Sequence, residues 1–339
     1  MAPRPGVRVR SIAPGRVNLI GDHTDYMGGR AMPMAVQMAT TITATIGGDR
    51  IELISAQVPG ALGLDLPVTA AAEVEPPWGR YVAGVAAELA AEVGMVGTIE
   101  SDLPLGSGLS SSASLEVAVA LALGDDGSPH EVARRCQLAE HRATGMPCGI
   151  MDQLAIAAGV QGHALLMDFE TLDVEPVALP DRARFWVVHS GQERRLVGSA
   201  YAQRRAECEQ AAATIGPLPH ASPEAIERLT DPTERARARH VRTECDRVTA
   251  FADALRSGDL VAAGALMTAS HASLRDDFEV STTRLDELVA QLCGLEGVHG
   301  ARLTGAGFGG CVVALAEPGI ELAGWQVHAS DGARVEIDP

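Results

Sequence analysis

The sequence predicts an α+β protein of two domains, because strand patterns and helical patterns fall into separate runs along the chain. A length of 339 residues is more than one compact core usually holds. The N-terminal part alternates β-branched and polar residues as strands do, whereas the stretch Leu196–Cys293 has a mostly helical pattern. We therefore divide the chain into domains 1–182 and 183–339, with the boundary near Pro180–Arg184.

Each element of the N-terminal part has its own local pattern. Strict alternation over a short run predicts a strand, and apolar residues at helical spacing predict a helix. The predicted strands are Val7–Ile12, Thr40–Ile46, Ile51–Ser55 and Gly97–Ser101. The predicted helices are Leu109–Leu123, Pro129–Thr144 and Ile150–Ala158. Strands return at His163–Phe169 and Ala183–His189.

The C-terminal part is helical until its last segment. Turn clusters near Gly216–Pro219 and Ser257–Asp259 interrupt the helices. The stretch RLTGAGFGGCVVALAE, residues 302–317, then predicts a strand, a glycine turn and a second strand. A continuous apolar run such as that of the second strand is expected for buried sheet.

Composition and charge argue against several classes of protein. With 46% hydrophobic and 21% charged residues, the chain has the make-up of a soluble globular protein. We find no secretory signal and no run of about eighteen uncharged apolar residues, so we expect a cytoplasmic protein. A net charge of −17 repels phosphate backbones and anionic lipid, which makes nucleic acids and membranes poor partners.

Cysteine and lysine usage narrows the chemistry further. The six cysteines lie far apart without a C-x-x-C pair, which predicts buried free thiols rather than zinc ligands or a disulfide framework. All 27 basic residues are arginine, so chemistry that needs a cation must use arginine or a metal ion. The Walker-type phosphate loop contains a lysine and is therefore excluded.

The stretch LPLGSGLSSSAS, residues 103–114, has the features of an anion-binding loop. Gly106 and Gly108 let the backbone approach a ligand closely, and Ser110–Ser112 open a helix whose first N–H groups lack internal partners. The helix dipole adds partial positive charge there, so the loop suits phosphate, and the hydroxyl of Ser112 could also bind Mg²⁺. A glycine turn before an over-capped helix is the alternative. A serine nucleophile is disfavoured because no G-x-S-x-G motif is present.

A second stretch, APGRVNLIGDHTDYMGG at residues 13–29, concentrates polar residues between glycines. Asp22 and Asp25 can accept paired hydrogen bonds from a polyol, and Arg16 suits a phosphoryl group. Turn formation by the two aspartates is the alternative, and His23 could be a structural histidine.

Two acids stand at the ends of predicted helices. In PCGIMDQLAIAAG, residues 147–159, Asp152 begins an otherwise apolar helix, either as a functional acid or only as a favourable partner of the helix dipole. Glu140 lies late in the preceding helix, where a negative charge opposes the dipole and invites a compensating cation.

Together these motifs resemble the galactokinases. The stretch at 13–29 is similar to the galactokinase signature, and LTGAGFGGC at 303–311 is similar to the third motif of the GHMP small-molecule kinase superfamily. The serine loop is similar to the phosphate-binding motif of that superfamily, which also contains homoserine, mevalonate and phosphomevalonate kinases. The segments RRLVGSAYAQRRAECE at 194–209 and SHASLRDDFEVS at 270–281 resemble galactokinases in particular.

The resemblance implies a fold and a set of site residues. An N-terminal domain resembling part of a ribosomal protein would meet a ferredoxin-like C-terminal domain, with the active site in the cleft between them. The ATP phosphates would lie on Gly106, Ser107, Gly108, Leu109, Ser110, Ser111 and Ser112. Mg²⁺ would be held by Ser112 and Glu140, and the anomeric hydroxyl of the sugar would face Asp152 and Arg16. The sugar would contact Asp22, His23, Thr24, Asp25, Gly149 and Tyr201.

We therefore expect a monomeric, ATP-dependent sugar 1-kinase whose partners are galactose and ATP. A 1-kinase for a related aldose or amino sugar and a non-catalytic sensor of galactose and ATP are the alternatives. Asp152 would act either as a base or as a group that orients the hydroxyl. The family's GEHTDYN stands as GDHTDYM here, so Asp22 is one methylene shorter than the glutamate that reaches the C6 hydroxyl in relatives.

Overall fold

The computed structural model describes residues 5–104, 106–192 and 197–338 of the chain. Within these residues the strands form three sheets, and the helices α5 to α9 all fall between residues 197 and 293. Strands and helices are thus grouped in separate runs, which confirms the predicted α+β class.

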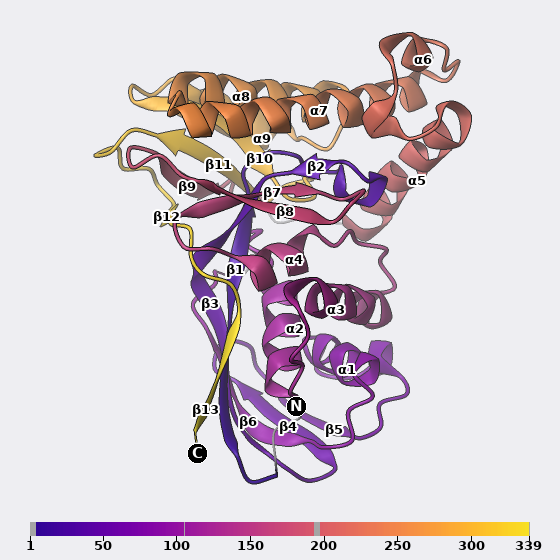
Figure 1. Cartoon of the computed structure of the whole chain (residues 1–339), viewed down its shortest axis with the longest axis vertical. Coiled ribbons are helices and arrows are strands. Elements are labelled where there is room, and N and C mark those ends of the chain that lie inside the picture. Colours follow the sequence, from indigo (N-terminus) through magenta and orange to yellow (C-terminus); the bar gives the residue numbers. More distant parts are fainter. Residues whose placement is uncertain (1–4, 105, 193–196, 339) are drawn as a thin grey trace.

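The largest sheet has six strands and forms the lower part of the molecule in Figure 1. Its strand order is β13-β1-β3-β6-β4-β5, antiparallel except for the β4–β6 pair. The register of β1 against β3 shifts between Pro14 and Arg16, and such a bulge re-aims the side chains beside it. The strands are β1 (Arg8–Asn18), β3 (Pro33–Ile46), β4 (Arg50–Ser55), β5 (Ala61–Asp65), β6 (Met95–Ser101) and β13 (Arg334–Asp338).

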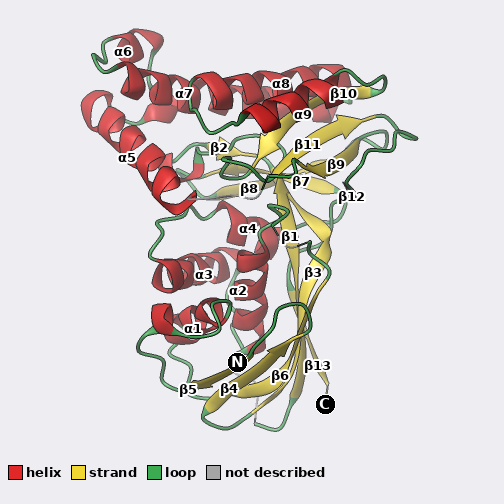
Figure 2. Cartoon of the chain, turned by 180° about the vertical axis from the view of Figure 1, so that it is seen from behind, coloured by secondary structure: helices red, strands yellow, loops and turns green. Residues whose placement is uncertain are grey.

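Four helices cover one face of this sheet (Figure 1 and Figure 2). Their apolar sides share a core with the strands, as Val82, Val117 and Ile42 illustrate. Helix α3 begins with a capping box in which the side chains of Ser128 and Glu131 each bond the backbone N–H of the other residue. The helices are α1 (Gly79–Glu88), α2 (Ser111–Ala122), α3 (Pro129–Thr144) and α4 (Met151–Ala158).

The second half of the chain builds a four-stranded antiparallel sheet in the order β10-β11-β9-β12. Helices α8 and α9 pack on it, and Figure 2 shows them lying with α7 above the sheet. Every residue of β11 is buried, which confirms the buried strand predicted from the continuous apolar run. The strands are β9 (Arg184–His189), β10 (Val298–Thr304), β11 (Cys311–Ala316) and β12 (Trp325–Val327). The helices are α5 (Val197–Ile215), α6 (Pro223–Glu227), α7 (Pro232–Ser257), α8 (Leu260–Asp276) and α9 (Thr283–Cys293).

The two halves of the chain are joined by more than a linker. Strand β13 pairs with β1, with Val9 opposite Ile337, so the end of the chain completes the sheet that its beginning started. A shared core also contains Val17 from the first half together with Phe185 and Phe251 from the second. The third sheet lies between them in Figure 1, and the division at residue 182 stays a prediction. That sheet consists of β2 (Arg30–Ala31), β7 (His163–Asp168) and β8 (Asp173–Ala178).

All six cysteines are free thiols in the structure, as predicted. Four of them are buried, and Cys148 and Cys293 are partly exposed. Among the helices of the described residues, none has both the length and the apolar character needed to cross a membrane.

Candidate active site

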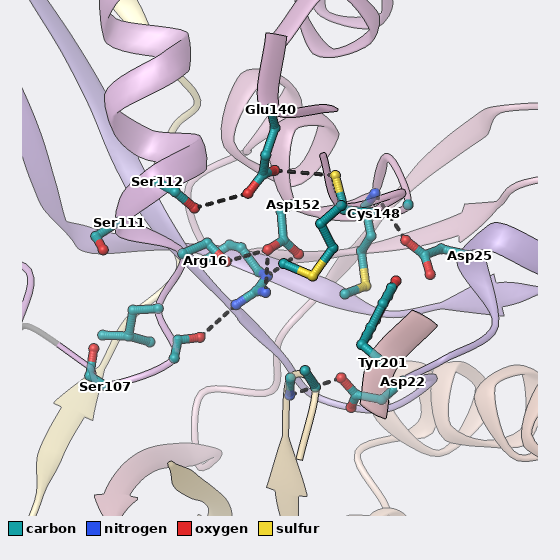
Figure 3. A pocket seen from close by; sticks show the side chains of 18 of the residues that line it. Arg16, Asp22, Asp25, Ser107, Ser111, Ser112, Glu140, Cys148, Asp152 and Tyr201 are labelled. Carbon is teal, nitrogen blue, oxygen red and sulfur yellow. Dashed lines mark hydrogen bonds and ion pairs between the residues drawn. The ribbon is translucent and has the colours of Figure 1, made fainter. Parts of the chain in front are cut away.

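A cavity of about 280 Å³ lies where the two halves of the chain meet. Its walls are the loop after β1, the serine loop, the end of α3 and the start of α4, with α5 and the β10–β11 turn from the second half (Figure 3). All predicted site residues except Thr24 line this cavity. They are Arg16, Asp22, His23, Asp25, Gly106, Ser107, Gly108, Leu109, Ser110, Ser111, Ser112, Glu140, Gly149, Asp152 and Tyr201.

Thr24, which we expected to contact the sugar, does not line the cavity. Its side chain is buried, and its hydroxyl lies 2.9 Å from the carbonyl oxygen of Gly21 and 2.7 Å from that of Arg30. These contacts stabilise the folded conformation of the galactokinase-like stretch at 13–29. Residues 194–196 of the galactokinase-like segment at 194–209 lie outside the described residues.

Arg16 and Asp152 form a two-point ion pair at the centre of the cavity (Figure 3). Arg16 follows the bulge in β1, and Asp152 stands in the first turn of α4. The Arg16 Nε and Nη2 atoms donate to Asp152 Oδ1 at 2.7 Å and Oδ2 at 2.5 Å. Nη1 of Arg16 donates to the carbonyl oxygen of Gly108 at 2.7 Å. Because all three guanidinium nitrogens are engaged, the arginine holds the carboxylate in one orientation.

The serine loop leaves the N-terminus of α2 open to a ligand. Gly106 and Gly108 have φ angles of 73° and 75°, which glycine adopts without strain. Ser110 occupies the cap position of α2, but its hydroxyl donates to Asp152 Oδ2 at 2.5 Å and makes no cap. The over-capped helix considered as an alternative is therefore not present. An N-terminus without a side-chain cap offers its first N–H groups to an anion such as phosphate.

Glu140 and Ser112 place two oxygen atoms next to each other at one end of the cavity. Ser112 Oγ lies 3.4 Å from Glu140 Oε1, and Glu140 Oε2 accepts a hydrogen bond from Gln153 Nε2 at 2.7 Å. Burial, together with the negative charge of Asp152, raises the pKa of Glu140. A raised pKa means that the ionised form of Glu140 is disfavoured there, and a bound cation would stabilise that form. Mg²⁺ prefers such hard oxygen ligands combined with substrate phosphates, so these residues fit a Mg²⁺ ion.

Asp22 is buried, and its partners come from the end of β10 and from the third motif that overlaps it. Arg302 of β10 is fully buried and pairs with Asp22 Oδ2, while the N–H of Gly305 donates to Oδ1 at 2.9 Å. Sequence reasoning missed Arg302, although it stands immediately before the recognised LTGAGFGGC motif. The neighbouring His23 has its Nε2 3.2 Å from the carbonyl oxygen of Ala306, and burial lowers its pKa to about 3. The imidazole is therefore neutral at physiological pH.

Asp25, Gly149 and Tyr201 form the wall opposite the serine loop. A Cβ atom at Gly149 would collide with the Asp25 carboxylate, so only glycine allows this close approach. Burial and the nearby charge of Asp152 raise the pKa of Asp25 to about 6. The ring of Tyr201 lies 5.5 Å from that of His23, measured between centroids.

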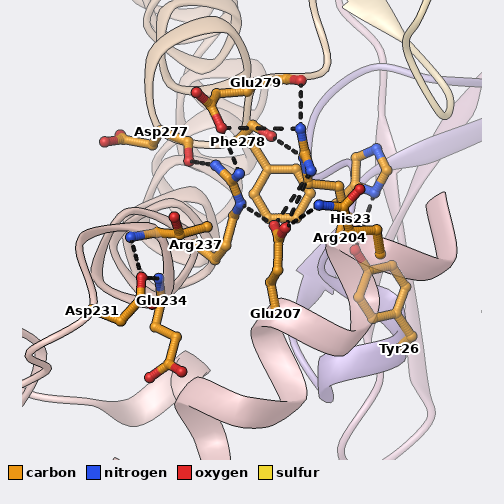
Figure 4. Close-up of polar contacts among 12 residues, drawn as sticks. His23, Tyr26, Arg204, Glu207, Asp231, Glu234, Arg237, Asp277, Phe278 and Glu279 are labelled. Carbon is orange, nitrogen blue, oxygen red and sulfur yellow. Dashed lines mark hydrogen bonds and ion pairs between the residues drawn. The ribbon is translucent and has the colours of Figure 1, made fainter. Parts of the chain in front are cut away.

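Helix α5, which carries Tyr201, is braced by a buried arginine of α7 (Figure 4). Arg237 donates through Nε to Glu207 Oε2 of α5 at 2.7 Å and through Nη2 to Glu279 Oε2 at 2.5 Å. Glu279 belongs to the galactokinase-like segment at 270–281. That segment therefore supports the helix that brings Tyr201 to the cavity.

A second cavity of about 280 Å³ adjoins the first, because Ser111 and Ser112 line both. Its other walls include the aromatic rings of Trp78 and Tyr81 and the side chain of Leu103. Sequence reasoning missed this cavity. The available signal was the aromatic pair in WGRY at 78–81, in a chain with only 3% aromatic residues.

Three family models match the chain, and they fall on the segments that build the cavity. The galactokinase galactose-binding signature matches residues 5–46, the GHMP kinases N terminal domain matches 80–160, and the GHMP kinases C terminal model matches 251–322.

Individual proteins are similar over nearly the whole chain. A galactokinase from Homo sapiens is 42% identical over 325 residues, which cover 90% of this chain and 83% of the relative. The solved galactokinase of Lactococcus lactis in complex with galactose superimposes with a TM-score of 0.88 at 32% identity, covering 96% of this chain and 95% of that one. The mevalonate kinase of Methanococcus jannaschii, at 21% identity, shares the fold with a TM-score of 0.65 over 91% of this chain and 90% of its own.

These likenesses confirm the predicted two-domain GHMP kinase fold and the resemblance seen in the motifs. Full-length similarity to galactokinases, together with a galactose-binding signature that falls on the wall of the cavity, makes this chain a member of the galactokinase family.

Proposed function

We propose that the protein transfers the γ-phosphoryl group of ATP to the anomeric hydroxyl of galactose. The observation that carries the proposal is the Arg16–Asp152 pair, which stands beside the open N-terminus of α2 in a cavity walled by the galactose-binding signature. A non-catalytic sensor is not favoured, because this pair and the serine loop are both in place. Kinases for other aldoses or amino sugars are not favoured, because the similar proteins named above include galactokinases at high coverage.

The nucleotide occupies both cavities in this proposal. Its triphosphate lies on the serine loop, where the first N–H groups of α2 and the backbone at Gly106 and Gly108 face the phosphates. Its base lies in the second cavity against the rings of Trp78 and Tyr81, because a flat aromatic molecule stacks favourably on such walls. The buried Nε1 of Trp78 has no partner among the described residues, so it is available as a donor.

Asp152 acts on the sugar hydroxyl. Its side chain is 31% exposed, so the carboxylate that Arg16 orients still faces the cavity. Phosphoryl transfer passes through a loose transition state, and the protein mainly positions the reactants and stabilises the developing charge. Asp152 therefore orients the hydroxyl first and accepts its proton late. Arg16 and the N–H groups of α2 stabilise charge on the transferred group.

Ser112 and Glu140 would hold Mg²⁺ beside the phosphates. When bound, the ion neutralises charge on the phosphate oxygens. The direct protein ligands are then one hydroxyl and one carboxylate, which suits a Mg²⁺ ion that keeps waters and phosphates as its remaining ligands. A monomeric state and a cytoplasmic location stay predictions.

The experiment that tests the function is an ADP-release assay with the purified protein, ATP and a panel of hexoses and pentoses. We expect galactose to give the highest kcat/KM of the panel. Absence of galactose-dependent ADP release would contradict the proposal. A higher kcat/KM for another sugar would show that this other sugar, and not galactose, is the preferred substrate.

The variants Ser112→Ala and Glu140→Gln test the metal site. Each removes one oxygen ligand but leaves the backbone cradle intact, so we expect the Mg²⁺ concentration for half-maximal activity to rise about tenfold or more. The affinity for metal-free nucleotide, measured by calorimetry, should change little. Ser111→Ala is the matched control for the Mg²⁺ requirement alone, because Ser111 lines the same cavity but Ser112 is the serine whose hydroxyl lies next to Glu140. An unchanged Mg²⁺ dependence in both variants would leave Ser112 and Glu140 with structural roles only.

Asp22→Glu is expected to sharpen selection for galactose over analogues that lack the C6 hydroxyl, such as arabinose and 6-deoxygalactose. Both carboxylate oxygens of Asp22 are engaged by Arg302 and Gly305, so the natural side chain is drawn toward β10 and holds that hydroxyl loosely. A site that fully pairs a hydroxyl rejects the analogue without it by up to about 10⁴-fold, whereas a loose one cannot.

The measurement is the ratio of kcat/KM for galactose and for each analogue, in the natural protein and in Asp22→Glu. If the natural protein is the more selective of the two, Asp22 does not relax recognition of the C6 end of the sugar.

A further inference from the structure

A buried acid lies directly behind the proposed metal site. Glu116 stands in the middle of α2, within the apolar run LEVAVALAL, and its residue is 0% exposed. Gln153, the residue after Asp152, is also 0% exposed. The Nε2 atom of Gln153 donates to Glu116 Oε2 at 3.0 Å and to Glu140 Oε2 at 2.7 Å. One amide group thus bridges two carboxyl groups, of which the first is fully buried.

Two atoms of this bridge lack a partner. Glu116 Oε1 and Gln153 Oε1 are buried, and neither has a hydrogen bond within the described parts of the chain. Both are acceptors as long as Glu116 is ionised, so neither can satisfy the other. An unsatisfied buried polar atom is destabilising, and native structures contain few of them.

The surroundings of Glu116 disfavour a negative charge. No arginine or histidine forms an ion pair with it in the described residues. Burial, together with the charge of Glu140, raises the pKa of Glu116 well above its ordinary value. The titratable groups around it are acids, thiols and a phenol, namely Tyr81 of α1, Cys136 and Glu140 of α3, Cys148 and Asp152.

A neutral carboxylic acid would satisfy both atoms. Its O–H group donates and its carbonyl oxygen accepts, and a primary amide offers the complementary donor and acceptor. The existing bond from Gln153 Nε2 to Glu116 Oε2 is one side of such a pair, and the two unpartnered oxygens are the atoms that would form the other side.

We propose that Glu116 is a neutral acid paired with the amide of Gln153, and that this pair is a positioning element for Glu140. The amide of Gln153 donates to Glu140 Oε2 and so fixes the carboxylate with its other oxygen, Oε1, facing Ser112. The effect on the metal rests on the proposed function, whereas the acid–amide pair itself does not. Glu116 touches neither substrate nor metal in this arrangement.

Two substitutions distinguish a neutral Glu116 that positions Glu140 from a Glu116 that acts through a negative charge. Glu116→Gln replaces the acid by an amide that has the same donor and acceptor, so its Mg²⁺ dependence should stay close to that of the natural protein. Glu116→Leu removes the pair and frees the amide of Gln153, so the Mg²⁺ requirement should rise about tenfold, as for the loss of a group that orients a metal ligand. A loss in Glu116→Gln as large as that in Glu116→Leu would overturn the proposal.

Two further measurements need no metal or substrate, so they remain informative if Glu116→Leu fails to fold or if the metal site is elsewhere. The infrared difference spectrum of the natural protein against Glu116→Gln at neutral pH should contain the C=O band of a carboxylic acid. Absence of that band would show an ionised Glu116 and overturn the proposal.

The second measurement is the pH dependence of unfolding in the same two proteins. The folded natural protein keeps the Glu116 proton, whereas the unfolded chain releases it above the ordinary pKa of 4.5. As pH rises above that value, the folding equilibrium constant of the natural protein should therefore fall relative to Glu116→Gln, by up to about tenfold per pH unit. If the ratio of the two folding equilibrium constants stays constant with pH, Glu116 is ionised in the folded protein, and the proposal is wrong.

Discussion

Asp152→Asn is expected to lower kcat by about 100-fold or more, the range typical of a positioned acid or base. The substitution preserves the volume of the side chain but removes the charge that accepts the hydroxyl proton in the proposed reaction. It also turns the ion pair with Arg16 into a single neutral hydrogen bond, because the amide group has only one acceptor oxygen. Arg16 is only 5% exposed, so its guanidinium loses part of its orientation. The affinity for galactose should change far less, because Asp152 is only one of the residues proposed to contact the sugar.

Steady-state kinetics with ATP and galactose, together with calorimetric binding of the sugar, measure the two effects separately. Asp168→Asn is the matched control, because Asp168 also pairs with an arginine, Arg30, but does not line the cavity. Turnover of Asp152→Asn within a few-fold of the natural protein would make Asp152 an ordinary first-turn acid of α4.

Arg302→Met is expected to lower the free energy of unfolding by about 3 to 5 kcal/mol. Arg302 is fully buried, and its partner Asp22 is 2% exposed, so the substitution leaves a buried carboxylate without its cation. The N–H of Gly305 still donates to Asp22, but a single neutral donor does not replace the charge of a guanidinium.

Urea unfolding at neutral pH measures this loss. Arg10→Met is the matched control, because Arg10 and Glu336 form an ion pair of which both side chains are half exposed, and its loss should change stability by less than about 1 kcal/mol. The double variant Asp22→Asn with Arg302→Met should recover part of the stability, since the uncompensated charge is gone. Equal losses in Arg302→Met and Arg10→Met would show that the buried pair contributes no more than an exposed one.

The sequence predicted best those helices and strands whose pattern is contained in a few consecutive residues. Helix α3 has a capping box at Ser128 and Glu131, and it begins and ends where the pattern predicts. Strand β11 is an uninterrupted apolar run and is buried throughout. By contrast, α1 at 79–88 was missed because its start has no capping signal, with Trp78 at the cap position, and because Gly79 and Gly84 lower its helix propensity.

Three edge strands, β2, β12 and β13, were missed for a different reason. Strands β2 and β12 have only two and three residues, too few for an alternating pattern to be recognised. Strand β13 exists because it finds β1 at the opposite end of the chain, and nothing in its own residues 334–338 specifies that partner.

The sequence by itself determined the family, and it predicted the chemistry at single chain segments: an anion site at the serine loop, an acid at the start of α4 and an acid in need of a cation at Glu140. Glycine conformations and the electrostatics of helix ends are properties of a few consecutive residues, so they can be inferred without a fold. Only the tertiary structure decided which side chains meet. It turned Thr24 inward, paired Asp22 with Arg302 and set Gln153 against Glu116, because burial joins residues that are distant in sequence and favours arrangements in which buried polar groups find partners there.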